Sequence, residues 1–247
     1  VVNASDPIPA VVESDATGDI KNIFDDIKNV TGVDVVNLVW RHLATTQNAL
    51  PYLWGVLRPL YESGFINHQA VEFQNQLVLP KLPKFKDEIL LASGIDKLGK
   101  ITINNILLSY NRTNTVNLIA LQAALITLKG VKDVTLDQTH KKTTNDSLLP
   151  MPRLPAISDL NPTIISLVQE LNSLGEEDGT IIASMYRHLA YWPNYLALVK
   201  IALEPIASSG ELKRAIDKSR EQSAKKALSL SKFLAPFPPS ISSSCSY

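Results

Sequence analysis

The sequence contains a single cysteine, Cys245, so no disulfide can form within the chain and a thiol nucleophile is not expected. It contains no run of 18 apolar residues and therefore predicts no membrane-spanning helix. Glycine is scarce, with 10 residues in 247, which argues against a turn-rich all-β protein. The 24 Lys and Arg residues balance the 24 Asp and Glu residues. This balance gives no electrostatic footprint for nucleic acid or an anionic membrane, and neither partner is expected.

Several motifs that would identify a chemistry are also missing. The sequence has no glycine-rich phosphate loop, no Gly-x-Ser-x-Gly elbow and no His-Glu-x-x-His pair. Its Cys, His, Asp and Glu residues do not recur with metal-ligand spacing, so we expect no metal and no cofactor. The first residues form neither a basic stretch nor an apolar one, which favours a cytoplasmic protein.

The main feature that is present is an internal repeat. Residues 41–64 align without a gap with residues 187–210, and 10 of the 24 positions are identical. The alignment opens on two copies of one tetrad, Arg41-His42-Leu43-Ala44 and Arg187-His188-Leu189-Ala190. Both copies carry apolar residues at helical spacing, so the repeat predicts two similar helical halves.

The fold class that follows is all-α, a pseudo-dimer of two similar helical repeats with a cleft between them. We expect an extended lead-in over 1–17, a first repeat over 18–129, a proline-rich linker over 130–160, a second and shorter repeat over 161–233 and a flexible tail over 234–247. Asp34 is expected to cap the second helix. The end of the first repeat predicts helices over 101–110 and 115–128, with Asn111 to Asn114 forming the turn between them. The second repeat lacks a counterpart of residues 95–128.

These motifs resemble a known family. The pattern Arg-His-Leu-Ala-x-x-x-Asn-x-Leu, together with Tyr110-Asn111-Arg112-Thr113-Asn114, is similar to the all-α group I 2-haloacid dehalogenases. The resemblance covers most of residues 18–210. It implies two similar helical halves that meet around a buried active site.

The resemblance also assigns roles to positions, and one of them departs from the family. Asn114 matches the asparagine that helps to hold the catalytic water. The aspartate that activates this water, seven residues before Trp192, corresponds to Met185, which cannot act as a base. Glu177 and Asp178 lie about two helical turns away and could replace it only if the helix began differently. Three further pocket positions of the family, a tryptophan, a phenylalanine and a tyrosine, fall at Val35, Leu38 and Asn117.

The function expected from this departure is that of a dehalogenase-like protein without hydrolytic dehalogenase activity, which binds a small organic acid or an apolar ligand between its halves. Whether it catalyses another reaction stays open. An alternative is a non-catalytic helical interaction module, because the shorter second half would leave apolar surface for a homodimer or a larger assembly. A third reading is an active dehalogenase with a relocated base.

Seven residues are candidates for ligand binding, and no catalytic residue is assigned. The two arginines could clamp a carboxylate from both halves, or fix the packing of the halves through salt bridges. The two histidines could bind a metal or exchange a proton, or serve as structural groups that are hydrogen-bonded at the interface between the halves. The asparagines could orient a ligand or form a turn, and the serine could face a pocket or bond to its own helix. The candidates are Arg41, His42, Asn111, Asn114, Ser184, Arg187 and His188.

Overall fold

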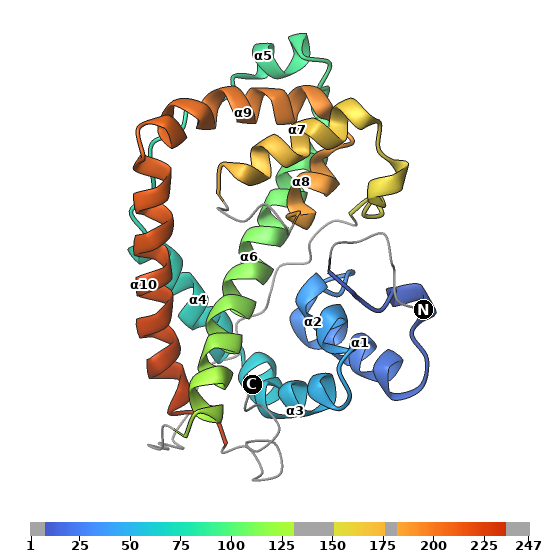
Figure 1. Cartoon of the computed structure of the whole chain (residues 1–247), viewed down its shortest axis with the longest axis vertical. Coiled ribbons are helices and arrows are strands. Elements are labelled where there is room, and N and C mark those ends of the chain that lie inside the picture. Colours follow the sequence, from blue (N-terminus) through green and yellow to red (C-terminus); the bar gives the residue numbers. More distant parts are fainter. Residues whose placement is uncertain (1–7, 131–150, 176–181, 236–247) are drawn as a thin grey trace.

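The computed structural model describes residues 8–130, 151–175 and 182–235 (Figure 1). Every element in these ranges is a helix, as the all-α prediction requires. Large parts of the expected lead-in, linker and tail lie outside the described residues, as do Glu177, Asp178 and Cys245. The helices are α1 (Gly18–Thr31), α2 (Leu38–Leu43), α3 (Ala49–Glu62), α4 (Phe65–Gln76), α5 (Asp87–Ala92), α6 (Lys97–Leu128), α7 (Pro162–Ser173), α8 (Ser184–Leu189), α9 (Pro193–Ser208) and α10 (Glu211–Ser231), with short 3-10 turns at Glu13–Asp15 and Ile157–Asp159.

The two copies of the sequence repeat have the same local structure. Helices α2 and α8 both span six residues, and α4 and α10 begin at equivalent positions of the two copies. Gly64 and Gly210 separate the preceding helices from α4 and α10, with φ angles of 74° and 72°. Glycine adopts this left-handed conformation without the steric cost that a Cβ atom brings. The repeated glycine therefore sets the same sharp change of direction in both copies.

Two local predictions were wrong. Asp34 does not cap α2, which begins at Leu38 after Asn37. The turn expected at Asn111 to Asn114 does not exist, because α6 continues from Lys97 to Leu128 as one helix. The weak helix propensity of asparagine costs only about 0.7 kcal/mol per residue. Packing on both sides of this stretch outweighs that cost.

The packing that keeps α6 continuous comes from two separate cores. The N-terminal half of α6 contributes Ile103 and Ile106 to a core formed with α5, α7, α8 and α9. Its C-terminal half contributes Ile119 and Ala123 to a core formed with α1, α3, α4 and the end of α10. Helix α10 runs beside α6 from the end of α9 towards the first core (Figure 1). Helix α6 therefore connects both halves of the protein.

An aromatic group in the first core fixes the position of α2. The ring of Trp40 lies 5.5 Å from Trp54 and 6.2 Å from Tyr61. Trp40 Nε1 and Tyr61 Oη both donate hydrogen bonds to Asn117 Oδ1 on α6, at 3.2 and 2.8 Å. The three aromatic side chains are almost fully buried, which places Trp40 and Trp54 in the core. The start of α2 is thereby held against the middle of α6.

Candidate functional site

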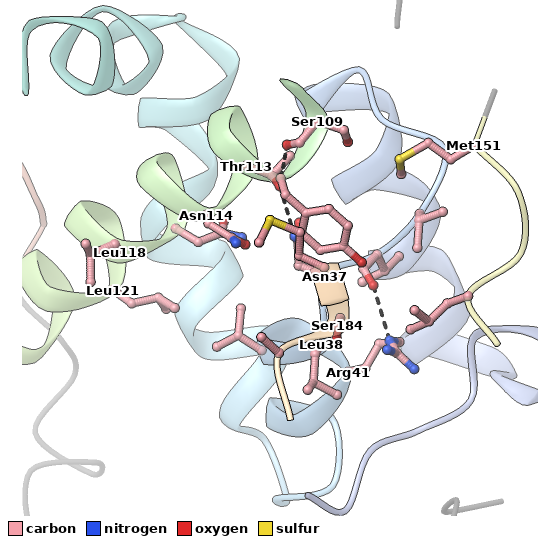
Figure 2. A pocket seen from close by; sticks show the side chains of 18 of the residues that line it. Asn37, Leu38, Arg41, Ser109, Thr113, Asn114, Leu118, Leu121, Met151 and Ser184 are labelled. Carbon is pink, nitrogen blue, oxygen red and sulfur yellow. Dashed lines mark hydrogen bonds between the residues drawn. The ribbon is translucent and has the colours of Figure 1, made fainter. Parts of the chain in front are cut away.

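A cavity of about 480 Å³ lies between the start of α2, the middle of α6 and the start of α8 (Figure 2). The segment that carries Met151 and Leu154 completes its wall. Among the described residues that line this cavity, Arg41 is the one charged side chain, and the lining includes no Asp or Glu. Amide and hydroxyl side chains share the wall with leucine, valine and methionine. The cavity can thus hold a small molecule with both a polar and an apolar part.

A polar stripe on α6 forms one side of the cavity. Ser109, Thr113 and Asn117 follow one another at intervals of four residues and share one face of the helix. Asn37 Nδ2 donates to Thr113 Oγ1 at 3.0 Å, and Thr113 Oγ1 donates to the Ser109 carbonyl at 2.9 Å (Figure 2). These bonds connect Asn37, the residue before α2, to the polar stripe on α6.

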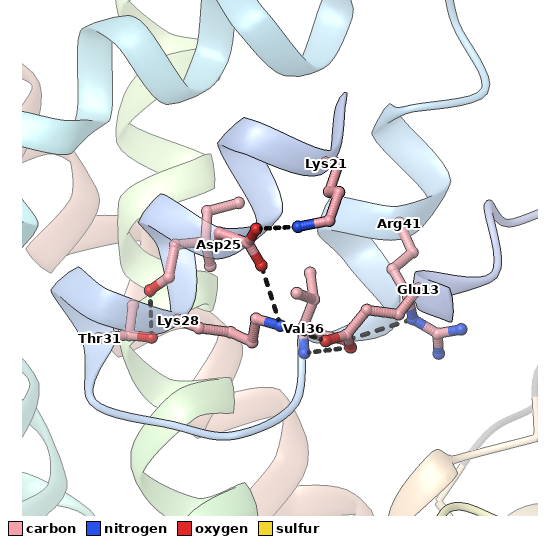
Figure 3. Close-up of polar contacts among 8 residues, drawn as sticks. Glu13, Lys21, Asp25, Lys28, Thr31, Val36 and Arg41 are labelled. Carbon is pink, nitrogen blue, oxygen red and sulfur yellow. Dashed lines mark hydrogen bonds and ion pairs between the residues drawn. The ribbon is translucent and has the colours of Figure 1, made fainter. Parts of the chain in front are cut away.

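The side chain of Arg41 is held by the loop that precedes α2. Arg41 Nε donates to the Val36 carbonyl at 3.2 Å, and the Val36 amide donates to Glu13 Oε2 at 3.0 Å (Figure 3). Lys28 Nζ donates to Glu13 Oε1 at 2.8 Å, and this bond is the main reason that the pKa of Lys28 is raised. Glu13 and Lys28 thereby fix the loop whose Val36 carbonyl holds the Arg41 side chain at the cavity.

Tyr110 joins the cavity wall to a buried histidine. The hydroxyl of Tyr110 lies 3.0 Å from His188 Nδ1, and His188 Nε2 forms a short hydrogen bond with the Pro152 carbonyl. A carbonyl only accepts, so Nε2 carries the proton and Nδ1 accepts from the tyrosine. Burial lowers the pKa of His188, and the nearby Arg187 charge lowers it further. The neutral imidazole therefore has both ring nitrogens engaged.

Helix α8 and the turn that follows it hold the segment that carries Met151 and Leu154. Besides the bond from His188 to Pro152, Arg187 Nη2 donates to the Pro155 carbonyl at 2.8 Å and Tyr191 donates to the Arg153 carbonyl at 2.8 Å. In the first copy, His42 Nδ1 donates to the Pro9 carbonyl at 2.7 Å. Each repeated histidine thus bonds to a proline carbonyl in the segment that precedes its own repeat.

No protein-family model matches the sequence, and no curated protein matches it. Solved structures do resemble the fold. A D-2-haloacid dehalogenase mutant in complex with D-2-CPA superposes with a TM-score of 0.72 at 16% sequence identity, covering 100% of this chain and 85% of that chain. A D-2-haloacid dehalogenase with L-LA gives a TM-score of 0.71 at the same identity and coverage. The chain has the fold of the D-2-haloacid dehalogenases.

Within this dehalogenase fold, the positions that the sequence resemblance assigns to an active site lie around one cavity. The set comprises Val35 before α2, Leu38 at the start of α2, Asn114 and Asn117 on α6, and Met185 on α8. These residues are separated by up to 150 positions in the sequence, yet all of them line the same 480 Å³ space. The methionine stands where the resemblance expects the water-activating aspartate.

Of the seven residues predicted to bind a ligand, three line the cavity of this dehalogenase fold: Arg41, Asn114 and Ser184. The other four, His42, Asn111, Arg187 and His188, are not among its lining residues. Asn111 is exposed on α6, and its carbonyl accepts from Gln74 Nε2 at 3.1 Å. Arg187 and His188 are buried behind the wall that they hold. Because α6 is continuous, Asn114 lies in mid-helix and does not cap a helix.

Sequence reasoning named Asn117 through the resemblance but missed Ser109 and Thr113, which line the cavity on the same face of α6. The four-residue spacing of Ser109, Thr113 and Asn117 is a signal for a polar helix face, but it becomes visible only when residues 101–128 are treated as one helix. Within the described ranges, no three His, Cys, Asp or Glu side chains gather closely enough to hold a metal ion. No helix in these ranges is long and apolar enough to cross a membrane.

Proposed function

We propose that this protein is a dehalogenase-like binding protein that takes a small organic acid into the cavity beside Arg41 and does not hydrolyse carbon–halogen bonds. The observation that carries the proposal is the composition of the cavity: among the described residues that line it, Arg41 is the one charged residue, and Met185 occupies the position of the expected base. The two parts of the proposal, binding and the absence of hydrolysis, rest on these two residues separately.

The binding part follows from the chemistry of the wall. A guanidinium group suits a carboxylate because its N–H donors match the two carboxylate oxygens. Amide and hydroxyl groups from Asn37, Ser109, Asn114 and Ser184 add hydrogen-bonding capacity for a substituent next to the carboxylate. The remaining wall is mostly aliphatic and suits a short hydrocarbon part. A volume of about 480 Å³ lies within the usual range for small-molecule sites.

The absence of hydrolysis is proposed because no base stands among the described residues that line the cavity. Activation of water requires a group of suitable pKa within hydrogen-bond reach of that water. The described lining residues supply no carboxylate. His188 lies behind the wall, but Tyr110 and the Pro152 carbonyl occupy its two nitrogens. Its depressed pKa also makes it a weak proton acceptor.

The placement of the cavity supports a pseudo-dimer with the ligand between its halves. Three pairs of residues at equivalent positions of the repeat line the same cavity: Asn37 with Ala183, Leu38 with Ser184, and Val39 with Met185. Each pair contributes one residue from the α2 region and one from the α8 region. A site built from matching positions of both copies is what a duplicated helical unit would produce.

The binding part is tested by the thermal shift of the purified protein with 2-chloropropionate, lactate and propionate, each at millimolar concentration. A ligand that binds the native state raises the melting temperature according to RT ln(1 + [L]/Kd). We expect a shift with these acids that Arg41→Gln abolishes and Arg41→Lys partly retains. Arg220→Gln removes an exposed arginine on α10 that does not line the cavity, and it should leave the shift unchanged.

The absence of hydrolysis is tested by halide release from both enantiomers of 2-chloropropionate. We expect no chloride above the protein-free blank. Release of chloride at enzymatic rates would refute this part of the proposal and indicate a relocated base. A lack of any thermal shift with all three acids would refute the binding part.

A second candidate function, self-association as an interaction module, is favoured by an exposed apolar segment between α4 and α5. Val78, Leu79 and Leu82 are 68%, 64% and 50% exposed. Clusters of exposed apolar side chains of this kind commonly mark interaction surfaces. Light scattering after size exclusion would test it: a dimer that Val78→Ser with Leu79→Ser converts to a monomer supports self-association, and a monomeric wild-type protein excludes it.

A further inference from the structure

A second cavity of about 440 Å³ lies beside the first, between the segment that precedes α5, the N-terminal half of α6, and helices α8 and α9. Its wall is mainly aliphatic and aromatic, with Ile103, Leu107, Val199 and Leu203 among the lining residues. One residue, Met185, lines both cavities. Met185 therefore borders both spaces.

Residues on one face of helix α6 line both cavities. Lys100, Asn104 and Leu107 line the second cavity, and Tyr110, Asn114 and Leu118 continue the same three-to-four-residue spacing along the first. From Lys100 to the last lining residue, Leu125, the helix rises by roughly 38 Å at 1.5 Å per residue. The two cavities therefore follow one another along α6.

We propose that the two cavities form one ligand site and that its ligand is a straight-chain carboxylic acid. The carboxylate lies at Arg41, and the alkyl chain passes Met185 into the second cavity. This inference rests on the proposed function and extends it from short acids to acids with a longer apolar chain. Methionine suits the boundary because its unbranched thioether side chain adapts its shape to neighbouring groups.

The charges around the two cavities fix the direction of the ligand. Arg41 and Tyr110 both line the first cavity, on the same side of Met185. In the second cavity, Lys100 Nζ pairs with Asp87 Oδ1 at 2.5 Å, so that its charge is already matched. Lys84, the other charged lining residue, is exposed to water. The carboxylate therefore belongs at Arg41 and the chain in the apolar second cavity.

The test is the affinity of straight-chain acids of four to twelve carbons, measured by isothermal titration calorimetry on the full chain. Burial of each added methylene should raise the affinity by roughly fourfold until the second cavity is filled. Ala202 lines this cavity, and Ala202→Phe puts a ring into it. We expect this variant to weaken binding of decanoate more than tenfold and to leave butyrate binding unchanged. Ile201→Phe is the matched control, because the neighbouring Ile201 is 68% exposed and lines neither cavity.

Leu107→Trp provides a second obstruction from α6 in case Ala202→Phe does not fold, and the adjacent, 59% exposed Leu108 provides its control as Leu108→Trp. Decanoate binding that neither cavity variant weakens would overturn the inference, because the chain would then lie elsewhere. Butyrate binding without any gain from longer chains would also overturn it while leaving the proposed function intact. Failure of all acids to bind would refute the proposed function itself.

Discussion

Asn117 offers a direct test of how the cavity wall is held in place. Its Oδ1 atom accepts hydrogen bonds from Trp40 Nε1 and from the Tyr61 hydroxyl, and both donors are almost fully buried. Burial raises the pKa of Tyr61 far above its ordinary value, so the hydroxyl keeps its proton and remains a donor. Asn117→Leu keeps a side chain of similar size but removes the acceptor. Both donors then stay buried without a partner.

The expected cost follows from those two donors. A buried polar group that loses its partner costs about 1–3 kcal/mol, so Asn117→Leu should destabilise the protein by roughly 2–6 kcal/mol. Tyr61→Phe alone removes one neutral hydrogen bond while Asn117 retains the other, and it should cost about 1 kcal/mol. In the Asn117→Leu background, the same Tyr61→Phe change removes an unpaired hydroxyl and should cost nothing or restore stability. The two substitutions should therefore be coupled by about 1–3 kcal/mol.

The assay is urea denaturation of the wild type, the two single variants and the double variant, followed by circular dichroism at 222 nm. The coupling energy is the difference between the double-variant effect and the sum of the single effects. Single effects that add to within about 0.5 kcal/mol would refute the shared-acceptor arrangement, because independent sites behave in that way. Tryptophan fluorescence of Trp40 would report separately whether the ring has moved.

Three further predictions concern pH and backbone conformation. The folded pKa of His188 lies below 6.5, so the unfolded state takes up a proton first as pH falls, and the free energy of unfolding should drop by up to about 1.4 kcal/mol per pH unit below 6.5. Urea titrations at pH 7.5, 6.5 and 5.5 should show a smaller drop for His188→Gln than for the wild type. Equal drops would contradict the lowered pKa. Gly210→Ala should destabilise the protein by about 1–2 kcal/mol in thermal unfolding, because its φ of 72° is costly for a residue with a Cβ atom. The control Gly55→Ala, on an open helical surface, should stabilise the protein by up to about 1 kcal/mol. A stabilising Gly210→Ala would disprove the left-handed conformation. The Arg58 hydrogen bonds lower the pKa of Asp26, so the stability that Asp26→Asn removes at pH 7 should decrease as pH falls below 3.8 towards the folded pKa, and a difference that stayed constant over this range would be inconsistent with this.

The repeated part of the fold could be predicted from the sequence because the same helical pattern of apolar residues occurs in both copies. Helices α2 and α8 begin at equivalent positions, and Gly64 and Gly210 adopt the left-handed conformation in both copies. The prediction failed at residues 111–114, which have no counterpart in the second copy. The asparagines of residues 111–114 indicated a turn from local preference alone, and only the two cores at the ends of α6 show why the helix continues.

The candidate site was predictable in part for a similar reason. Arg41 and Asn114 could be named because each lies in a motif that is visible in the sequence. His188 and Arg187 were named for the same reason, but they hold the 152–155 segment from behind the cavity wall. A repeated residue signals that both copies need the same contact, and sequence alone does not say whether that contact faces a ligand or the protein backbone. The second cavity has no motif, because aliphatic residues at helical spacing resemble any core.

The division of α6 between two cores also has a consequence for how the chain folds. Residues Ala227, Leu230 and Leu234 complete the first core, which otherwise consists mostly of residues 16–124. During synthesis, this core therefore stays open until the end of α10 has left the ribosome, and the nascent chain exposes apolar surface until then. Once both cores are closed, loss of either one frees half of α6 and weakens the other, so the two halves are expected to unfold as one cooperative unit.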